Sequence, residues 1–488
     1  MWLSKSKFVA GWQCLKRLYL EVHQPELAGE LDAQTLAVFE QGLEVGRRAR
    51  ELFPGGVLVE ARPEEVRKAL QQTERMVAGR QHPAIFEATF TCDNLLARVD
   101  ILERRPRNEW RLIEVKSSTS VKAHYLFDVA LQRRVLEGLG MRVLPCLMHL
   151  NREYVYDGRR YELEKLFVIR NVADETAALD QDVKDLIREE RKVLASANPP
   201  DIGPGSHCTN PFTCEFYDAC NKQIPVDHVA NLPGITAKRL EELANRGIES
   251  IKMIPKGFPM TERQKRAWEC ARTGKTWFGK GLKQALAGLR YPLSFVDFET
   301  LGVALPRYAG MAPYDAIPFQ WSLHIQPKPG TELEHFEFLA DDTNDPRPEF
   351  IRTLCQVIAK TGSVVAYNSG FESGCLAGLA KWLPQYQDRI EDIQGRLWDP
   401  LPVMRAHVYD LEFLGSYSLK RVLPALVPGM TYDGMEVAEG NEAGLAWERM
   451  VHAEAGSEER KRLRDALLAY CKQDTLAMLR LLEVLQAA

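Results

Sequence analysis

The feature of this sequence that most restricts its fold is a short stretch near the middle, "HCTNPFTCEFYDAC", which runs from His207 to Cys220. Its three cysteines, Cys208, Cys214 and Cys220, are each separated by five residues. Many structural zinc sites and iron–sulfur clusters are held by four thiolates. The spacing therefore indicates either a metal centre whose fourth ligand lies elsewhere in the chain, or three buried reduced cysteines.

Length and composition favour a multidomain chain in a reducing compartment. A chain of 488 residues is expected to form two or three domains. Its formal net charge of -4 gives no overall basic field, although a local basic groove for nucleic acid is compatible with this balance. No secretory signal is recognisable, and no apolar run approaches the ~20 residues that span a bilayer. We therefore expect a cytoplasmic protein without a membrane partner, whose cysteines are reduced or bind metal.

The hydrophobic pattern predicts two α/β regions. The runs "AIFEATFTC", "NLLARVDILER" and "EWRLIEVKSS" alternate as strands do, and helical patterns lie on both sides of them. A second alternation of strands and helices begins at "YPLSFVDFET", after a Pro/Gly connector and a small helical segment. The sequence thus predicts an α/β fold with boundaries at 1–225, 226–288 and 289–488.

Asp100, Glu114 and Lys116 form the first chemically informative group. Glu114 and Lys116 are two residues apart on an expected strand, so their side chains share one face of the sheet. Asp100, in "ARVDIL" on the neighbouring strand, can reach them. Two carboxylates are hard ligands for Mg²⁺, and a nearby lysine can orient water or stabilise charge on a phosphate. The alternative is a surface salt bridge, which E-x-K often forms.

This group, followed by a helix that contains Gln132, resembles the PD-(D/E)XK nucleases in their RecB-type branch. The resemblance implies a restriction-endonuclease-like domain in which Asp100 and Glu114 bind Mg²⁺ or Mn²⁺. It also implies that Lys116 and Gln132 take part in catalysis.

Some nucleases of that branch carry an iron–sulfur cluster, held by one cysteine near the N-terminus and three after the catalytic core. The aromatic and basic stretch "WQCLKRLYL" provides Cys14 in that setting. The resemblance therefore implies a [4Fe–4S] cluster, with structural zinc as the alternative, on Cys14, Cys208, Cys214 and Cys220.

One position departs from the pattern of that branch. Its members often have a metal-binding histidine in an early helix, four residues after a glycine, whereas here Gly42 is followed by Gly46. Glu40 or Glu87 is an alternative ligand, and each is otherwise an ordinary surface or scaffold carboxylate. The departure leaves the activity of this site open.

Four carboxylates and a tyrosine form the second group. In "SFVDFET", Asp297 and Glu299 point to the same side of an expected strand end. Glu372 begins a helix after the strand "SVVAYN", and Tyr470 and Asp474 are four residues apart on one face of the last helix. Asp474 lies in an otherwise apolar pattern, where an unpaired charge is costly. Two metal ions bridged by such carboxylates can hydrolyse a phosphodiester.

The ordered set resembles the DEDD exonucleases of the DnaQ-like, ribonuclease H-like fold, in the variant with tyrosine in the last motif. The resemblance implies that Tyr470 orients the attacking water and that Asn368 and Phe371 lie near the substrate. Asp399 is expected to be an ancillary carboxylate that orders the fold. The metal ligands implied are Asp297, Glu299, Glu372 and Asp474. The family usually has aspartate at the third of these, so the longer Glu372 is a departure.

The stretch "LPGITAKRLEELANRGIESI" resembles a helix-hairpin-helix unit, in which Lys238 would assist phosphate binding; a helical spacer is the alternative. The chain as a whole resembles bacterial proteins that fuse a RecB-type iron–sulfur nuclease module to a DnaQ-like exonuclease module. This resemblance implies a metal-dependent DNA exonuclease in repair or antiviral defence, with RNA as an alternative substrate. An iron–sulfur nucleic-acid-binding adaptor with inactive nuclease sites is the other reading.

Overall fold

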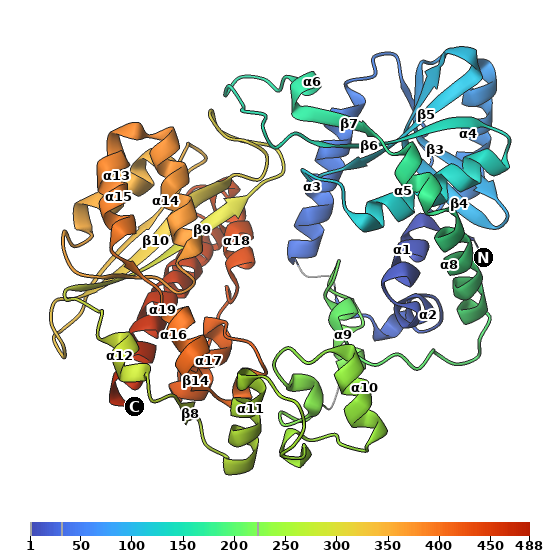
Figure 1. Ribbon diagram of the computed structural model, residues 1–488. Helices are drawn as coiled ribbons and strands as arrows, with labels where there is room; N and C mark the ends of the chain where they lie inside the picture. The colour runs from blue at the N-terminus through green and yellow to red at the C-terminus, as the bar shows by residue number, and fades with distance from the viewer. Residues whose placement is uncertain (1, 31–32, 222–223) are drawn as a thin grey trace. The chain divides into compact units, whose positions relative to one another are not determined.

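The computed structural model describes residues 2–30, 33–221 and 224–488, and the chain has the expected mixed α/β architecture (Figure 1). It divides into two compact units. Unit 1 comprises Met1–Lys222 and Val303–Asp315, and unit 2 comprises Gln223–Gly302 and Ala316–Ala488. No helix among the described residues combines the length and apolar character needed to cross a membrane.

Unit 1 is built on a seven-stranded sheet. Its strands pair in the order β2-β3-β4-β5-β6-β7, and β1 (Leu3–Ser4) pairs with β4. Strands β3 to β5 are antiparallel, whereas β6 runs parallel to β5 because the chain crosses over through α5 (Ala123–Gly138). The remaining bounds are β2 Val57–Leu58, β3 Ala84–Cys92, β4 Leu95–Arg105, β5 Glu109–Lys116, β6 Arg142–Leu150 and β7 Phe167–Asn171.

The three predicted strands before α5 are confirmed as β3, β4 and β5. Asp93 and Asn94 both have positive φ, 50° and 57°, which is the turn chemistry that closes a tight hairpin between β3 and β4. Strand β7 was not expected, because its five residues, "FVIRN", are mostly exposed and show no apolar alternation. A short edge strand of this kind leaves little signal in the sequence.

Both faces of the unit 1 sheet are buried. On one face Leu102 and Leu112 pack with α1, α4, α5 and α8; on the other Ile101 and Ile113 pack with α3. Residues of even number on β5, Glu114 among them, therefore face α1 and α5. On β4, Val99 lies in the same core as Leu102, so the alternation shifts by one residue beside Asp100. The helices are α1 Lys5–Gln13, α2 Leu15–His23, α3 Ala33–Arg50, α4 Val66–Gly79, α6 Leu163–Leu166, α7 Ala173–Ala178, α8 Asp180–Leu194 and α9 Tyr217–Asn221.

Residues 303–315, which lie between two strands of unit 2, belong to unit 1. The Gly310 amide donates to the Tyr156 carbonyl at 2.8 Å, and the Tyr156 amide donates to the Met311 carbonyl at 2.9 Å. The Tyr161 hydroxyl donates to the carbonyl of Pro306. Ala304 packs in the same core as α3.

Unit 2 contains a five-stranded sheet in the order β11-β10-β9-β12-β13. Strands β9, β10 and β11 are antiparallel, and β12 and β13 continue parallel to β9. Helices α13, α14 and α15 pack on one face, and α18 and α19 lie against β9 and β10. The bounds are β9 Leu293–Gly302, β10 Ala316–Gln326, β11 Glu334–Leu339, β12 Val364–Val365, β13 Leu397–Trp398, α13 Arg347–Val357, α14 Gly370–Trp382, α15 Gln387–Gly395, α18 Gly440–His452 and α19 Glu458–Ala487.

The segment before β9 shares a hydrophobic core with the last turns of α19. A short ladder joins β8 (Trp277–Phe278) to β14 (Val408–Tyr409). The turn Pro233-Gly234-Ile235 leads into α10 and follows a three-residue 3-10 turn, Val229–Asn231, where a helix-hairpin-helix unit would have its first helix. Lys238 is exposed. The helices here are α10 Ala237–Asn245, α11 Glu262–Thr273, α12 Leu282–Leu286, α16 Pro400–His407 and α17 Leu419–Leu426.

Candidate metal centres

The four predicted cluster cysteines line one cavity. Cys14 lies between α1 and α2 in an extended conformation (φ -162°, ψ 119°), so the chain turns a corner there and presents its thiol. Leu20, Phe216 and the Arg17 side chain line the same cavity. The thiols that the structure brings together are those of Cys14, Cys208, Cys214 and Cys220.

Polar contacts hold the cysteine loop against the first two helices. The Gln13 amide group donates to the carbonyls of His207 and Phe212, each at 2.7 Å. Arg17 pairs with Glu215 at 2.9 Å. Hydrogen bonds and an ion pair therefore hold the junction of α1 and α2, which contains Cys14, against the loop that contains the other three cysteines.

Burial raises the pKa of the Cys214 thiol to about 11 and also raises that of Cys220. Without a bound cation both are neutral thiols, and ligation would have to displace their protons. A different group, in unit 2, has the tightest spacing: among the described residues, only Asp297, Glu299 and Cys471 place three histidine, cysteine or carboxylate ligand atoms within 4.8 Å of one another. The cavity in unit 1 offers four thiols, a ligand set that suits a [4Fe–4S] cluster or a structural zinc ion.

Asp100, Glu114, Lys116 and Gln132 meet in unit 1. Glu114 is the centre of the group, with a side chain that is only 2% exposed. The Lys116 ammonium donates to Glu114 and to Asp128, both at 2.7 Å. The Gln132 amide donates to the same two carboxylates at 2.7 and 2.9 Å. Asp100 accepts from the Val115 amide at 2.8 Å.

Lys5, which belongs to no recognisable sequence motif, also enters this group. Its ammonium lies 2.8 Å from Glu114 Oε1 and 3.6 Å from Asp100 Oδ1. It is placed there by α1, whose first turn is capped by the Ser4 hydroxyl. Lys5 therefore stands between the two carboxylates that the resemblance assigns to a metal ion.

The charges of this group are largely balanced. Burial alone would raise the pKa of Glu114, but Lys116 and Lys5 outweigh it and hold that pKa below its usual range. Burial raises the pKa of Asp100 to about 7, with repulsion from Glu114 adding to it and Lys5 opposing it. Burial would lower the pKa of Lys116, but Asp128 and Glu114 reverse the shift and raise it.

Of the two alternatives to the missing histidine, Glu87 lies close enough to Asp100 to add to the rise in the pKa of that carboxylate. Glu87 is held by Arg50 at 2.5 Å and by Arg98 at 2.8 Å. Glu40 is exposed. Gly46 lies on α3, and a Cβ added to it would meet nothing within 4 Å.

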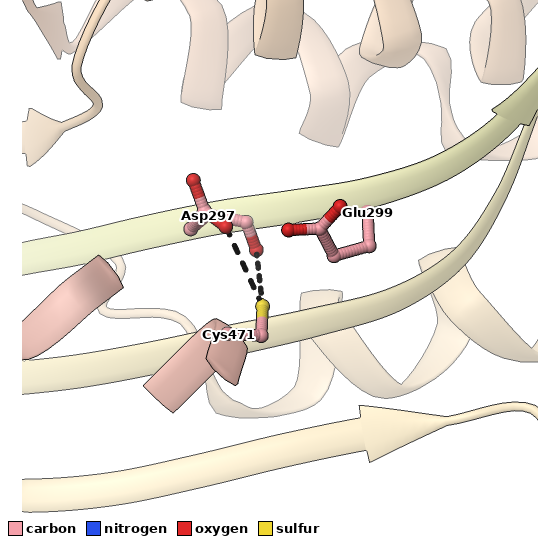
Figure 2. A group of neighbouring side chains, drawn as sticks. All are labelled: Asp297, Glu299 and Cys471. Carbon is pink, nitrogen blue, oxygen red and sulfur yellow. Dashed lines mark hydrogen bonds between the residues drawn. The ribbon is translucent and has the colours of Figure 1, made fainter. Parts of the chain in front are cut away.

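In unit 2, the Asp297 and Glu299 side chains lie on the same side of β9 (Figure 2). Cys471 approaches them from α19, and its thiol donates to Asp297 Oδ2 at 3.5 Å and to the Asp297 carbonyl at 3.7 Å. Cys471 was not selected from the sequence. It lies three residues before Asp474, which places both on one face of α19.

The unit 2 carboxylates repel one another in a buried setting. Burial raises the pKa of Asp297 well above its usual value, and the charges of Asp474, Glu299 and Glu372 add to the shift. Burial raises the pKa of Glu299 in the same way, with Asp474 adding to it and Lys420 opposing it. All four predicted ligands therefore lie close enough to interact electrostatically.

Asp474 has two hydroxyl neighbours. The Tyr432 hydroxyl donates to Asp474 Oδ1 at 2.5 Å. Burial raises the pKa of Asp474 to about 6, although Tyr432, Lys420 and Tyr470 each oppose the rise. The Lys420 ammonium lies 5.6 Å from the centre of the Tyr432 ring and 5.2 Å from that of Tyr470. Neither Tyr432 nor Lys420 belongs to a recognisable motif, and only the fold brings them here.

Glu372 lies on the first turn of α14 and is 3% exposed. Burial raises its pKa to about 8, and its Oε2 atom has no hydrogen-bond partner within the described chain. Asp399 accepts hydrogen bonds from the backbone amides of Asn368, Ser369 and Leu401. It thus holds the turn before α14, as expected of an ancillary carboxylate. Phe371 is exposed.

Residues 294–418 match a family described as "Domain of unknown function (DUF2779)". The matched range includes Asp297, Glu299, Glu372 and Asp399 and ends before Tyr470 and Asp474. No curated protein matches the chain.

Proposed function

We propose that this chain is a metal-dependent nuclease whose main active site is the carboxylate cluster of unit 2, in a DnaQ-like exonuclease domain of ribonuclease H-like fold. The observation that carries the proposal is the excess of buried negative charge. Burial raises the pKa of Asp297, Glu299, Glu372 and Asp474. Lys420 opposes this rise for Glu299 and Asp474. Buried carboxylates in such excess are satisfied by protons or by metal ions.

The donor set fits hard divalent cations such as Mg²⁺ or Mn²⁺, because carboxylate oxygens are their preferred ligands. Such cations, when bound, would supply the positive charge that phosphodiester hydrolysis requires. Asp297 and Glu299 would bind from β9, Asp474 from α19 and Glu372 from α14. Tyr470 would orient the attacking water, and exposed Phe371 would stack against a terminal base. The expected substrate is a DNA end or single strand, with RNA as an alternative.

For unit 1 we propose a RecB-type, restriction-endonuclease-like site, with Asp100 and Glu114 as metal ligands and Lys116 and Gln132 as catalytic residues. Lys5 already neutralises both carboxylates. A cation would have to displace the Lys5 ammonium, so this site would bind metal more weakly than the site in unit 2.

The four cysteines of the cavity suit a [4Fe–4S] cluster, the centre that the resemblance implies, with a structural zinc ion as the alternative. Cys14, Cys208, Cys214 and Cys220 would hold the cluster, which would stabilise the fold of unit 1. A cytoplasmic role in DNA repair or defence agrees with this assignment, since the cytoplasm keeps thiols reduced.

The second candidate is an iron–sulfur nucleic-acid-binding adaptor. The position of Lys5 between Asp100 and Glu114 favours it for unit 1, because an ion pair there would serve structure without catalysis.

Degradation of end-labelled DNA tests the two candidates. Single- and double-stranded DNA and RNA would be incubated with Mn²⁺ and anaerobically purified protein, using Asp297→Asn, Lys116→Ala, the double variant and Glu391→Gln, a surface control on α15. We expect Asp297→Asn to slow shortening from the ends by a factor of about 100 or more, the usual scale for losing a charge-stabilising group. Equal degradation by the wild type and the double variant would refute the nuclease proposal.

A further inference from the structure

The unit 2 cluster contains a thiol as well as carboxylates. The Cys471 sulfur and one oxygen each of Asp297 and Glu299 all lie within 4.8 Å of one another. Figure 2 shows the three side chains converging from β9 and α19. Because Cys471 is fully buried, its thiol contacts this cluster and not solvent.

The spacing fits three ligands of one ion. Carboxylate oxygens bind first-row metals at about 2.0–2.2 Å and thiolates bind zinc at about 2.3 Å, so two ligands of one ion lie roughly 3 to 4.5 Å apart. The thiol hydrogen now lies between sulfur and Asp297, at an S–O distance of 3.5 Å. On ligation the S–H bond would break, the proton would pass to buffer and a sulfur–metal bond would form.

A second observation beside this group also points to a cation. Glu372 is almost completely buried, its Oε2 has no hydrogen-bond partner within the described chain, and its charge acts on both Asp297 and Glu299. An unpaired buried carboxylate oxygen is costly unless a cation or a proton satisfies it.

We propose that Cys471 is a metal ligand together with Asp297 and Glu299, so that the unit 2 site prefers thiophilic first-row cations over Mg²⁺. This inference rests on the proposed nuclease function for its catalytic meaning. A thiolate is a soft ligand that favours Zn²⁺ and Co²⁺, while Mg²⁺ prefers oxygen ligands only. The competing reading is that the thiol merely orients Asp297 through its hydrogen bond.

Cobalt spectroscopy on the full chain separates these readings. Co²⁺ bound to a thiolate has a near-ultraviolet sulfur-to-metal charge-transfer band. We would titrate three proteins with Co²⁺ and subtract from each spectrum the one recorded before Co²⁺ was added. The proteins are the wild type, Cys471→Ser and Cys355→Ser, which is a control in α13 away from the cluster. We expect the band to have the same strength in the wild type and Cys355→Ser and to be weaker in Cys471→Ser, since any contribution from the four cavity cysteines is common to the three proteins. A band of equal strength in Cys471→Ser, or no band in the wild type, would overturn the inference.

DNA degradation with Mg²⁺ and Mn²⁺ provides the second readout. Serine offers an oxygen in place of sulfur, so Cys471→Ser should raise the ratio of Mg²⁺- to Mn²⁺-supported activity at least tenfold over that of Cys355→Ser. An unchanged ratio would contradict metal ligation by sulfur. A cobalt band that depends on Cys471 in a protein that degrades no nucleic acid would uphold the ligand and refute the nuclease.

Discussion

The two carboxylate clusters of this chain differ in what neutralises them. In unit 1, Asp100, Glu114 and Asp128 are met by Lys5 and Lys116 at hydrogen-bonding or ion-pairing distance. In unit 2, burial raises the pKa of all four carboxylates, and Lys420 opposes the rise for Glu299 and Asp474. Similar acidic motifs can therefore produce a nearly balanced ion-pair network in one place and a strongly uncompensated one in another.

Because the two clusters differ in charge balance, removing one carboxylate should change the stability of the two units in opposite directions. Removing one member of a balanced buried network leaves its partners unpaired, which is costly. Removing one member of an uncompensated cluster relieves repulsion. The buried carboxylates of unit 1 thus stabilise its fold. Those of unit 2 lower the free energy of unfolding by repelling one another, and a bound cation would offset this loss.

Glu114→Gln is the sharpest test of this contrast. It leaves Lys5 and Lys116 without their shared partner and should destabilise unit 1 by about 4 kcal/mol. The matched change Asp297→Asn, in EDTA, should leave unit 2 as stable as before or more stable. Hydrogen exchange of the β5 and β9 amides at one pH would measure each unit separately. Equal losses in the two units would contradict the contrast.

The pH dependence of stability without metal should reveal the repulsion in unit 2. Burial raises the pKa of Asp474 from 3.8 to about 6 and that of Glu372 from 4.5 to about 8. Their contribution to stability is therefore complete below about pH 4 and is lost as the pH rises through 6 to 8. Asp474 alone accounts for about 3 kcal/mol.

Urea unfolding in EDTA at pH 5 and pH 8.5 would measure this loss. The double variant Glu372→Gln, Asp474→Asn should abolish most of it. In unit 1, Asp100 titrates in the same range, but Glu114 has a lowered pKa and its contribution is lost as the pH falls below about 4.5. A wild-type unit 2 with equal stability at both pH values would argue against repulsion.

Mn²⁺ should stabilise unit 2 selectively. At a hundredfold excess over its Kd, a cation that binds only the folded state adds about 2.7 kcal/mol. Differential scanning calorimetry with and without Mn²⁺ should show an upward shift of one transition, which Asp297→Asn removes and Lys116→Ala retains. A shift that depends on Lys116 would reverse the assignment of the stronger metal site.

Tyr432→Phe should have the smallest effect. It removes the hydrogen bond to Asp474 and should cost about 1 kcal/mol. Because Tyr432 opposes the rise in the pKa of Asp474, its loss should also move the pH midpoint of unit 2 stability upward. Tyr367→Phe, which removes a hydroxyl bond to the Tyr417 carbonyl, should reduce stability without moving that midpoint. If the wild type, Tyr432→Phe and Tyr367→Phe had the same pH midpoint of unit 2 stability, the proposed effect of Tyr432 on the pKa of Asp474 would be contradicted.

The regular elements were largely predictable because they have clear periods. The strand "NLLARVDILER" and the last helix were expected close to where β4 and α19 lie. Within β4 the alternation shifts by one residue between Val99 and Leu102, which lie in the same core, and no sequence pattern indicated this shift beside Asp100. The expected strand "SVVAYN" contains β12, although only two of its residues pair in the sheet. The two-residue strand β13 is too short to show a period, and only its pairing with β12 defines it.

The groups that neutralise each site were harder to predict. Lys5, Lys420 and Tyr432 lie far from the acidic motifs in sequence, and no local spacing links them to the carboxylates. Cys471 had a signal that was overlooked, since it lies at helical spacing from Asp474 beside Tyr470. Sequence patterns indicate which side chains share an element, but the balance of charge depends on elements that meet only in the fold.

The segment 303–315 has a practical consequence for cutting the chain. Tyr156 exchanges backbone hydrogen bonds with Gly310 and Met311, so unit 1 is discontinuous in sequence. A fragment ending near residue 225 would lose that part of its core, and a fragment beginning near residue 289 would carry a stretch of apolar residues with nothing to cover it. During synthesis, unit 1 cannot be completed until residue 315 has left the ribosome, by which time the first strand of the unit 2 sheet has already been made.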